Sequence, residues 1–178
     1  MKKVLLLFVA MAFAMSINAQ SVSEQMDNLD KLCVKLEKAL SKAPKPCGVS
    51  DVDTYVEACK LSATGAVGTA AKLKDLYKRE IGTTTDGVTE VTETKPTLED
   101  WMELGVAITA QSAGVTKAGE AAANAAKAVK DAPKMKAVGM TKSVKWSGDI
   151  LPVAGEALAE QVKAVNSIIE TLKSGKNL

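Results

Sequence analysis

The sequence contains no histidine, and this absence excludes several classes of active site at once. A Ser-His-Asp triad needs an imidazole as its base, and histidine is the commonest side-chain ligand of metals. Arg79 is the only arginine, so a cluster of guanidinium groups that binds phosphate is excluded as well. We therefore predict no catalytic residue, no cofactor and no metal site, and we expect a protein that is not an enzyme.

Residues 1–19 have the pattern of a secretory signal peptide. Lys2 and Lys3 form a basic start, an uncharged apolar run follows over 4–14, and residues 16–19 (Ser-Ile-Asn-Ala) suit cleavage. The run is too short to span a bilayer comfortably, and an uncleaved N-terminal anchor is the alternative. We predict export through a cleaved signal peptide, which would place the mature protein in the periplasm or the secreted fraction.

The mature chain, beginning at Gln20, has no net formal charge. The whole sequence has 23 basic and 21 acidic residues, and two lysines leave with the signal peptide, so 21 of each sign remain. Nucleic-acid binding needs a basic surface, and stacking on bases needs aromatic side chains, of which the mature chain has only four. Both shortages argue against a nucleic-acid partner.

Apolar residues recur at alternating spacings of three and four in four segments, a pattern typical of amphipathic helices. The expected helices cover residues 22–43, 51–81, 98–131 and 149–174, within one domain over 20–178. A shorter and weaker helix is expected within residues 133–148. The fold class is therefore all-α, an elongated antiparallel helical bundle of about four helices.

Polar residues mark where these helices should begin. The expected caps are Ser21 with Glu24, Ser50, Thr97 with Asp100, and either Ser147 or Asp149. Residues 82–97 have a different composition, because they are rich in threonine and acidic residues and nearly lack apolar ones. We predict a flexible, exposed loop there, with a short hairpin over residues 88–93 as the alternative.

Three cysteines, Cys33, Cys47 and Cys59, lie in the mature chain, and disulfides persist in exported proteins. If the first two helices form a hairpin that turns near residues 46–47, then Cys33 and Cys59 face each other. We therefore predict a Cys33–Cys59 disulfide, which leaves Cys47 as a free thiol. Pairing of Cys47 with either of the other two is the alternative.

Two groups of acidic residues stand at predicted helix starts: Asp51, Asp53 and Glu57 in one, and the acids of residues 99–103 in the other. A weak calcium site or a catalytic carboxylate pair is one interpretation. Helix capping, with favourable interaction with the helix dipole, is the simpler one.

Small and polar residues occur where helices would meet. Gly65 and Gly68 lie inside the second predicted helix, where they leave room for a neighbouring helix to pack closely. Gln111 occupies an otherwise apolar position of the third helix and is suited to fix the register of the bundle. Trp101 and Trp146 are expected near helix ends, either in the core or flanking one lateral site.

Two further segments bear on partners. Residues 127–145 contain six lysines and one acid, which suggests contact with a membrane surface or an acidic partner, unless they form only a solvated helix end. Residues 104–116 carry no charge, as in a membrane-inserting hairpin, but they are also typical of a buried bundle helix and are too short to span a bilayer.

These observations favour an exported, non-enzymatic interaction or structural protein of the cell envelope or secreted fraction. Its partner would be a protein or an envelope component, unless the chain associates with itself. Two alternatives are a membrane-active protein similar to helical pore-forming proteins, and a carrier of a small apolar ligand within the bundle.

Overall fold

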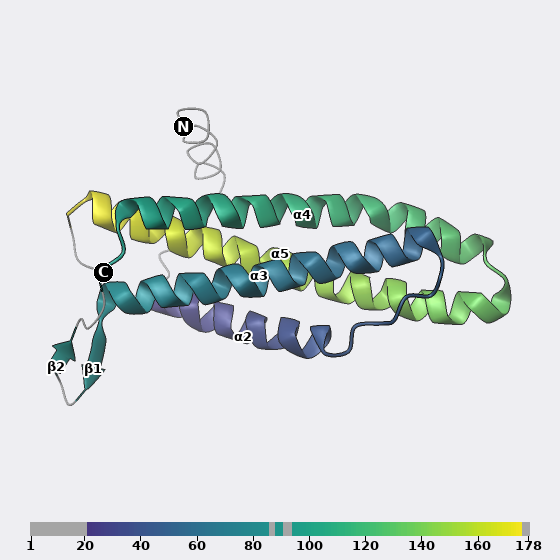
Figure 1. Cartoon of the computed structure of the whole chain (residues 1–178), viewed down its shortest axis with the longest axis horizontal. Coiled ribbons are helices and arrows are strands. Elements are labelled where there is room, and N and C mark those ends of the chain that lie inside the picture. The colour runs from purple at the N-terminus through teal and green to yellow at the C-terminus, as the bar shows by residue number, and fades with distance from the viewer. Residues whose placement is uncertain (1–20, 86–87, 91–93, 176–178) are drawn as a thin grey trace.

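The computed structural model describes residues 21–85, 88–90 and 94–175. The predicted signal peptide, residues 1–19, lies outside the described residues. The helices are α2 (Val22–Leu40), α3 (Ser50–Ile81), α4 (Leu98–Asp131) and α5 (Lys134–Lys173). Figure 1 shows them side by side along one long axis, each antiparallel to the next in sequence. The predicted all-α, elongated antiparallel bundle is confirmed.

The apolar residues that recur at spacings of three and four form the buried faces of the helices. An amphipathic helix is stabilised by removing this apolar stripe from water. The largest fully buried side chains include Leu29 and Leu36 of α2, Leu73 of α3, Trp101 and Ile108 of α4, and Met140, Ile150, Leu158 and Ile168 of α5. Each side chain of this size stabilises the fold by roughly 1.5–3 kcal/mol when fully buried. Alanines such as Ala118 of α4 and Ala154 of α5 fill other fully buried positions.

Both predicted capping boxes are present. The Ser21 side chain accepts from the Glu24 backbone N–H, the Thr97 side chain accepts from the Asp100 backbone N–H, and each acid reaches back to its cap. The prediction for Ser50 is wrong, because Val49 is the N-cap of α3 and no side chain caps it.

The start of the last helix is also corrected. The helix α5 begins at Lys134 rather than at residue 149, so neither Ser147 nor Asp149 is a cap, and the helix continues through Pro152. Ser143 and Ser147 are buried between Met140 and Ile150 and extend the helical stripe toward the N-terminus. The helix expected within residues 133–148 is therefore present, but as the first part of α5 and not as a separate helix; its pattern is weak because two of its inward positions are serines.

Residues 82–97 are not loop throughout. Strands β1 (Thr83–Thr85) and β2 (Val88–Glu90) pair antiparallel, with Thr84 opposite Thr89. Threonine and valine are β-branched and favour strands. The pairing lies earlier in the sequence than the hairpin considered as the alternative, whose last residues, 91–93, are outside the described part of the chain.

Side chains of α3 hold the segment that follows this hairpin. Arg79 donates from Nε and Nη2 to the Thr94 carbonyl oxygen, at 3.1 and 2.9 Å. Lys95 forms an ion pair of 3.4 Å with the buried carboxylate of Glu80. These contacts fix the chain where it turns from the hairpin into α4.

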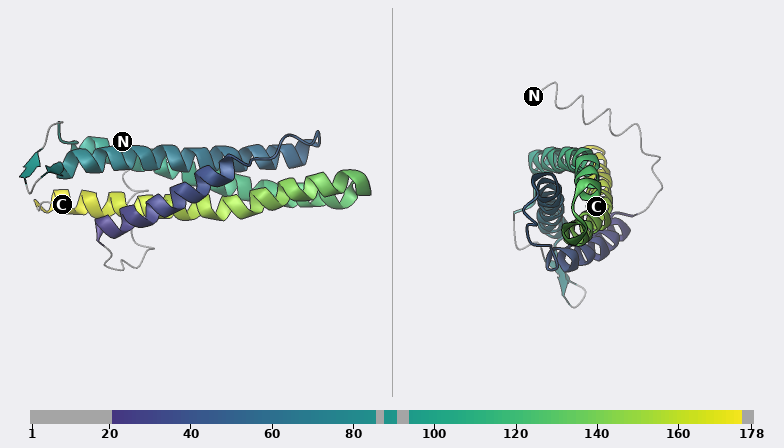
Figure 2. Two further views of the ribbon diagram at one scale, coloured as in Figure 1. Left: turned by 90° about the horizontal axis from the view of Figure 1, so that it is seen from below. Right: turned by 90° about the vertical axis from the view of Figure 1, so that its right-hand side faces the viewer.

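The predicted Cys33–Cys59 disulfide is wrong, because Cys33, Cys47 and Cys59 all have free thiols. The chain does not turn tightly at residues 46–47. Instead, residues 41–49 run as an extended linker along α3, so that α3 begins beyond the end of α2 (Figures 1 and 2).

This linker moves Cys33 and Cys59 to different levels of the bundle. An ion pair joins Asp30 of α2 to Lys74 of α3, which places Cys33 beside the last third of α3. Lys74 is 15 residues from Cys59 in α3, which is about 22 Å along the helix axis. Cys59 instead lies near Ser147 of α5.

Gly65 has the role that the sequence suggested, and Gly68 does not. A Cβ atom on Gly65 would collide with the side-chain amide of Gln111, so the missing side chain makes room for Gln111 of α4. No atom lies within 4 Å of the corresponding point at Gly68, so the expected close packing there is wrong.

Candidate binding groove between α2 and α5

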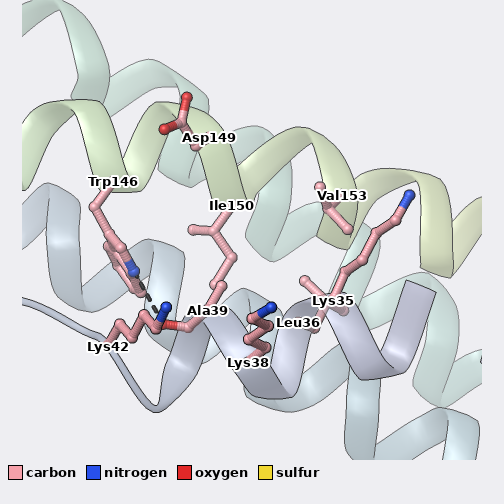
Figure 3. Close-up of a pocket in the computed structure, with 9 residues that line it drawn as sticks. All are labelled: Lys35, Leu36, Lys38, Ala39, Lys42, Trp146, Asp149, Ile150 and Val153. Carbon is pink, nitrogen blue, oxygen red and sulfur yellow. Dashed lines mark hydrogen bonds between the residues drawn. The ribbon is translucent and has the colours of Figure 1, made fainter. Parts of the chain in front are cut away.

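A groove with a volume of about 330 Å³ lies between the C-terminal half of α2 and the middle of α5 (Figure 3). It is lined by Lys35, Leu36, Lys38, Ala39, Lys42, Trp146, Asp149, Ile150 and Val153. In α2 the pair Lys35 and Leu36 lies three positions before the pair Lys38 and Ala39, and in α5 Trp146 lies three and four positions before Asp149 and Ile150, so each set shares one helix face. Two facing helices therefore form the two walls.

The floor of the groove is apolar. Leu36 and Ile150 are buried in the core, while Ala39 and Val153 are half-buried beside them. These positions continue the inward faces of α2 and α5, and Ala39 and Val153 stay partly open because α2 ends nearby at Leu40. The accessible part of the floor is thus formed by Ala39 and Val153, above the buried side chains of Leu36 and Ile150.

Trp146 closes one end of the groove. Its indole Nε1 donates a hydrogen bond of 3.0 Å to the Ala39 carbonyl oxygen, drawn as a dashed line in Figure 3. The last carbonyls of a helix lack the usual N–H partner four residues on, and the Ala39 oxygen accepts both the indole N–H and the backbone N–H of Lys42. This bond ties the end of α2 to α5.

The rim is mostly positive. Lys35, Lys38 and Lys42 stand on the α2 side, and Asp149 is the one acid among the lining residues. In the part of the chain that the structure describes, none of these four side chains forms an ion pair. The groove therefore offers an apolar surface bordered by lysines that form no ion pair among the described residues.

The positive surface continues along α5 beyond the end of α2. Lys134, Lys136, Lys142 and Lys145 lie there without an acid between residues 132 and 148, and none forms an ion pair within the described residues. Met135 and Val138 are 94% and 61% exposed in the same stretch. We call residues 134–145 the open flank of α5.

Sequence reasoning found part of this site. The lysine-rich segment 127–145 overlaps the open flank, and Trp146 lines a lateral site although it lies within a helix rather than near an end. Trp101, by contrast, is fully buried. The α2 lysines were missed, although their spacing of three and four beside the apolar seam was visible in the sequence.

The cysteines are not suited to nucleophilic chemistry. Burial raises the pKa of the Cys59 thiol more than hydrogen bonds with Ser147 and Tyr55 lower it. Burial and the neighbouring Cys59 thiol raise the pKa of Tyr55 to about 12. The pKa values of Cys33 and Cys47 are also raised, mainly by burial. Since the thiolate is the nucleophile, a raised pKa makes each of these thiols a weaker nucleophile at neutral pH than an ordinary cysteine.

The acidic groups at helix starts act as local hydrogen-bond acceptors. Asp53 accepts from the backbone N–H groups of Cys47 and Gly48 at 2.7 and 2.9 Å, and these bonds lower the pKa of its carboxyl. The Thr97 backbone N–H lowers the pKa of Asp100 in the same way. Among the described residues, no three Cys, Asp or Glu side chains are grouped as a metal site requires.

The uncharged stretch 104–116 lies within α4, where Leu104 and Ile108 are buried in the bundle. Within the ranges that the structure describes, no helix has the length and apolar character needed to cross a bilayer.

No protein-family model, curated protein or solved structure matches the chain. The groove and the open flank of α5 are therefore the features from which function is inferred.

Proposed function

We propose that the mature chain is an exported, non-enzymatic interaction protein of the cell envelope or secreted fraction, and that it binds a protein partner in the groove between α2 and α5. The single observation that supports this proposal is the set of lysines, which form no ion pair among the described residues, beside the partly exposed apolar side chains of Ala39, Trp146 and Val153. Exposed apolar surface rimmed by polar groups is typical of protein interaction sites.

The energetics of such a site favour a partner that covers both the apolar side chains and the lysines of the groove. Removing the exposed parts of Ala39, Trp146 and Val153 from water stabilises a complex by roughly 25 cal/mol for each Å² buried. The three lysines would increase the rate at which a negatively charged partner associates, and they would exclude basic ones. Trp146 adds a large aromatic anchor, a residue type that is common among the strongest contributors to binding.

Photo-crosslinking in the exporting cells tests the proposal. A photoreactive benzoylphenylalanine replaces Asp149 on the rim, and the matched control replaces Glu120, an exposed acid on α4. We expect a protein adduct from position 149 and none from position 120. The adduct should disappear in the K35Q/K38Q/K42Q variant and persist in K72Q/K78Q/K117Q, which removes three exposed lysines outside the groove.

Equal adducts from both positions, or loss of the adduct in both lysine variants, would contradict a specific protein site. Leakage of dye from lipid vesicles would instead favour the membrane-active alternative. A small apolar molecule that remains bound in native mass spectrometry, with no protein adduct, would favour the carrier. An adduct with a second copy of the chain would make the interaction self-association.

A further inference from the structure

We infer that the partner contributes an acidic amphipathic helix, which lies along the exposed face of α5 and covers the groove together with the open flank of α5. This inference rests on the proposed function and names the element that the groove receives. It follows from the missing length of α2, from the charge of the exposed surface and from the spacing of its residues.

The bundle lacks a fourth helix over part of its length. The helix α2 has 19 residues, whereas α3, α4 and α5 have 32, 34 and 40. Beyond Leu40 only the extended linker 41–49 continues, and Figure 2 shows that it follows α3. The N-terminal half of α5 therefore stays uncovered on the side where α2 would continue.

The uncovered residues lie on one face of α5. Met135, Lys142, Trp146, Asp149 and Val153 are spaced by seven, four, three and four, so they form a single stripe along the helix. From Met135 to Val153 the stripe is about 27 Å long, which matches a partner helix of about 18 residues. Gly139 lies in the same stripe, and no atom stands within 4 Å of its absent side chain.

Charge selects an acidic partner. The groove and the open flank together present seven lysines and one acid, Asp149, although the mature chain as a whole has no net charge. A helix with Asp and Glu beside its apolar stripe would place carboxylates against the lysines on the groove rim and against those of the open flank. The apolar stripe of the same helix would cover Met135, Trp146 and Val153, which are exposed or partly exposed.

Shape favours a helix over a lipid surface. A membrane surface is nearly flat on this scale, whereas the apolar floor lies recessed between two helix walls, with Leu36 and Ile150 buried beneath the lysines. Side chains from a partner helix reach into such a recess at every third or fourth residue, as they do in other helix-in-groove complexes.

The test uses a fluorescein-labelled synthetic peptide of about 20 residues, with leucines on one face and glutamates on the others, long enough as a helix to cover the stripe. Binding to the mature protein is followed by fluorescence anisotropy. One control peptide has the same composition in an order that scatters the leucines around the helix. A second control carries lysine in place of glutamate.

We expect the acidic amphipathic peptide to bind about tenfold or more tightly than either control, and to weaken as salt is added. The K35Q/K38Q/K42Q and K142Q/K145Q variants should each lower the affinity for the acidic amphipathic peptide by about tenfold. The K72Q/K78Q/K117Q variant should change this affinity by less than about twofold. Binding that is equal for the scrambled acidic peptide would overturn the inference, because charge alone would then suffice.

Two further outcomes separate the inference from the proposed function. A protein adduct at position 149 combined with no binding of the acidic peptide overturns the inference and leaves the proposed function standing. Binding to phosphatidylglycerol vesicles that is lost in the same lysine variants, with no protein adduct, overturns both and makes the site a membrane-surface contact.

Discussion

The indole nitrogen of Trp146 in α5 donates to the backbone carbonyl of Ala39 in α2, although the two residues are 107 positions apart in the sequence. Lys42, two residues after the end of α2, also donates its backbone N–H to this carbonyl. The bond therefore holds the terminal turn of the short helix against α5. The groove has a defined shape because its two walls are joined at this point.

Replacing Trp146 with phenylalanine should loosen that junction. The ring remains, but the N–H donor is lost, and a typical hydrogen bond contributes about 1 kcal/mol to the free energy of unfolding. We expect a loss of about that size in urea denaturation, together with faster hydrogen exchange of the backbone amides in the last turn of α2. An unchanged exchange rate there would show that the bond does not hold the helix end.

Gly65 and Gly68 provide a matched pair within one helix. Replacing Gly68 with alanine should increase the free energy of unfolding by about 0.5–1 kcal/mol, because alanine has the higher helix propensity and the space is open. Gly65→Ala should give a free energy of unfolding about 1 kcal/mol lower than that of Gly68→Ala, since Gln111 must move away from the new methyl group. In a Gln111→Ala background the two substitutions should become equivalent, and a difference that persists would contradict the contact.

Gln161 tests the cost of a buried polar group. It is fully buried in α5, its Nε2 donates to the Ala66 carbonyl at 2.9 Å, and its Oε1 has no hydrogen-bond partner among the described residues. Gln161→Leu should change the free energy of unfolding by less than about 1 kcal/mol, because the lost bond is offset by removing an unsatisfied oxygen. Gln161→Ala should cost about 2–4 kcal/mol, because a cavity remains. Equal losses in the two variants in urea denaturation would argue against this account.

The cysteines should behave as three free thiols of unequal accessibility. Cys47 is half-exposed, whereas Cys33 and Cys59 are buried. In the folded protein, a thiol reagent should modify Cys47 first, and it should reach the other two only after denaturation. Intact mass under non-reducing conditions should show a monomer without an internal disulfide. A mass lower by two hydrogens, with Cys33 and Cys59 protected from reagent after denaturation, would restore the disulfide that the structure lacks.

The same thiols predict how stability depends on pH. The pKa values of Cys33, Cys47 and Cys59 are raised above their ordinary value of 9.0, and that of Tyr55 rises to about 12. Above pH 9 the unfolded chain therefore releases protons that the folded chain retains, so the free energy of unfolding should fall as pH rises. Urea denaturation at increasing alkaline pH measures this slope, which should become shallower in a Cys33→Ala/Cys59→Ala variant.

The sequence by itself determined which face of each helix is buried. Leu29, Leu36, Leu73 and Ile108 belong to the apolar residues spaced by three and four in the predicted helices, and all are fully buried. This succeeds because burial of one stripe is what stabilises an amphipathic helix, and the stripe is a property of local spacing. The capping boxes at Ser21 and Thr97 were predictable for the same reason, since each needs only residues three positions apart.

Only the tertiary structure decided how the helices are placed along one another. The wrong Cys33–Cys59 pairing came from assuming a tight turn, whereas residues 41–49 extend along α3. The groove likewise depends on where α2 ends relative to Trp146, which no local pattern specifies. The physical reason is that spacing defines a helix face but leaves its axial position free, and that position is set by the packing of all four helices and the path of the linker.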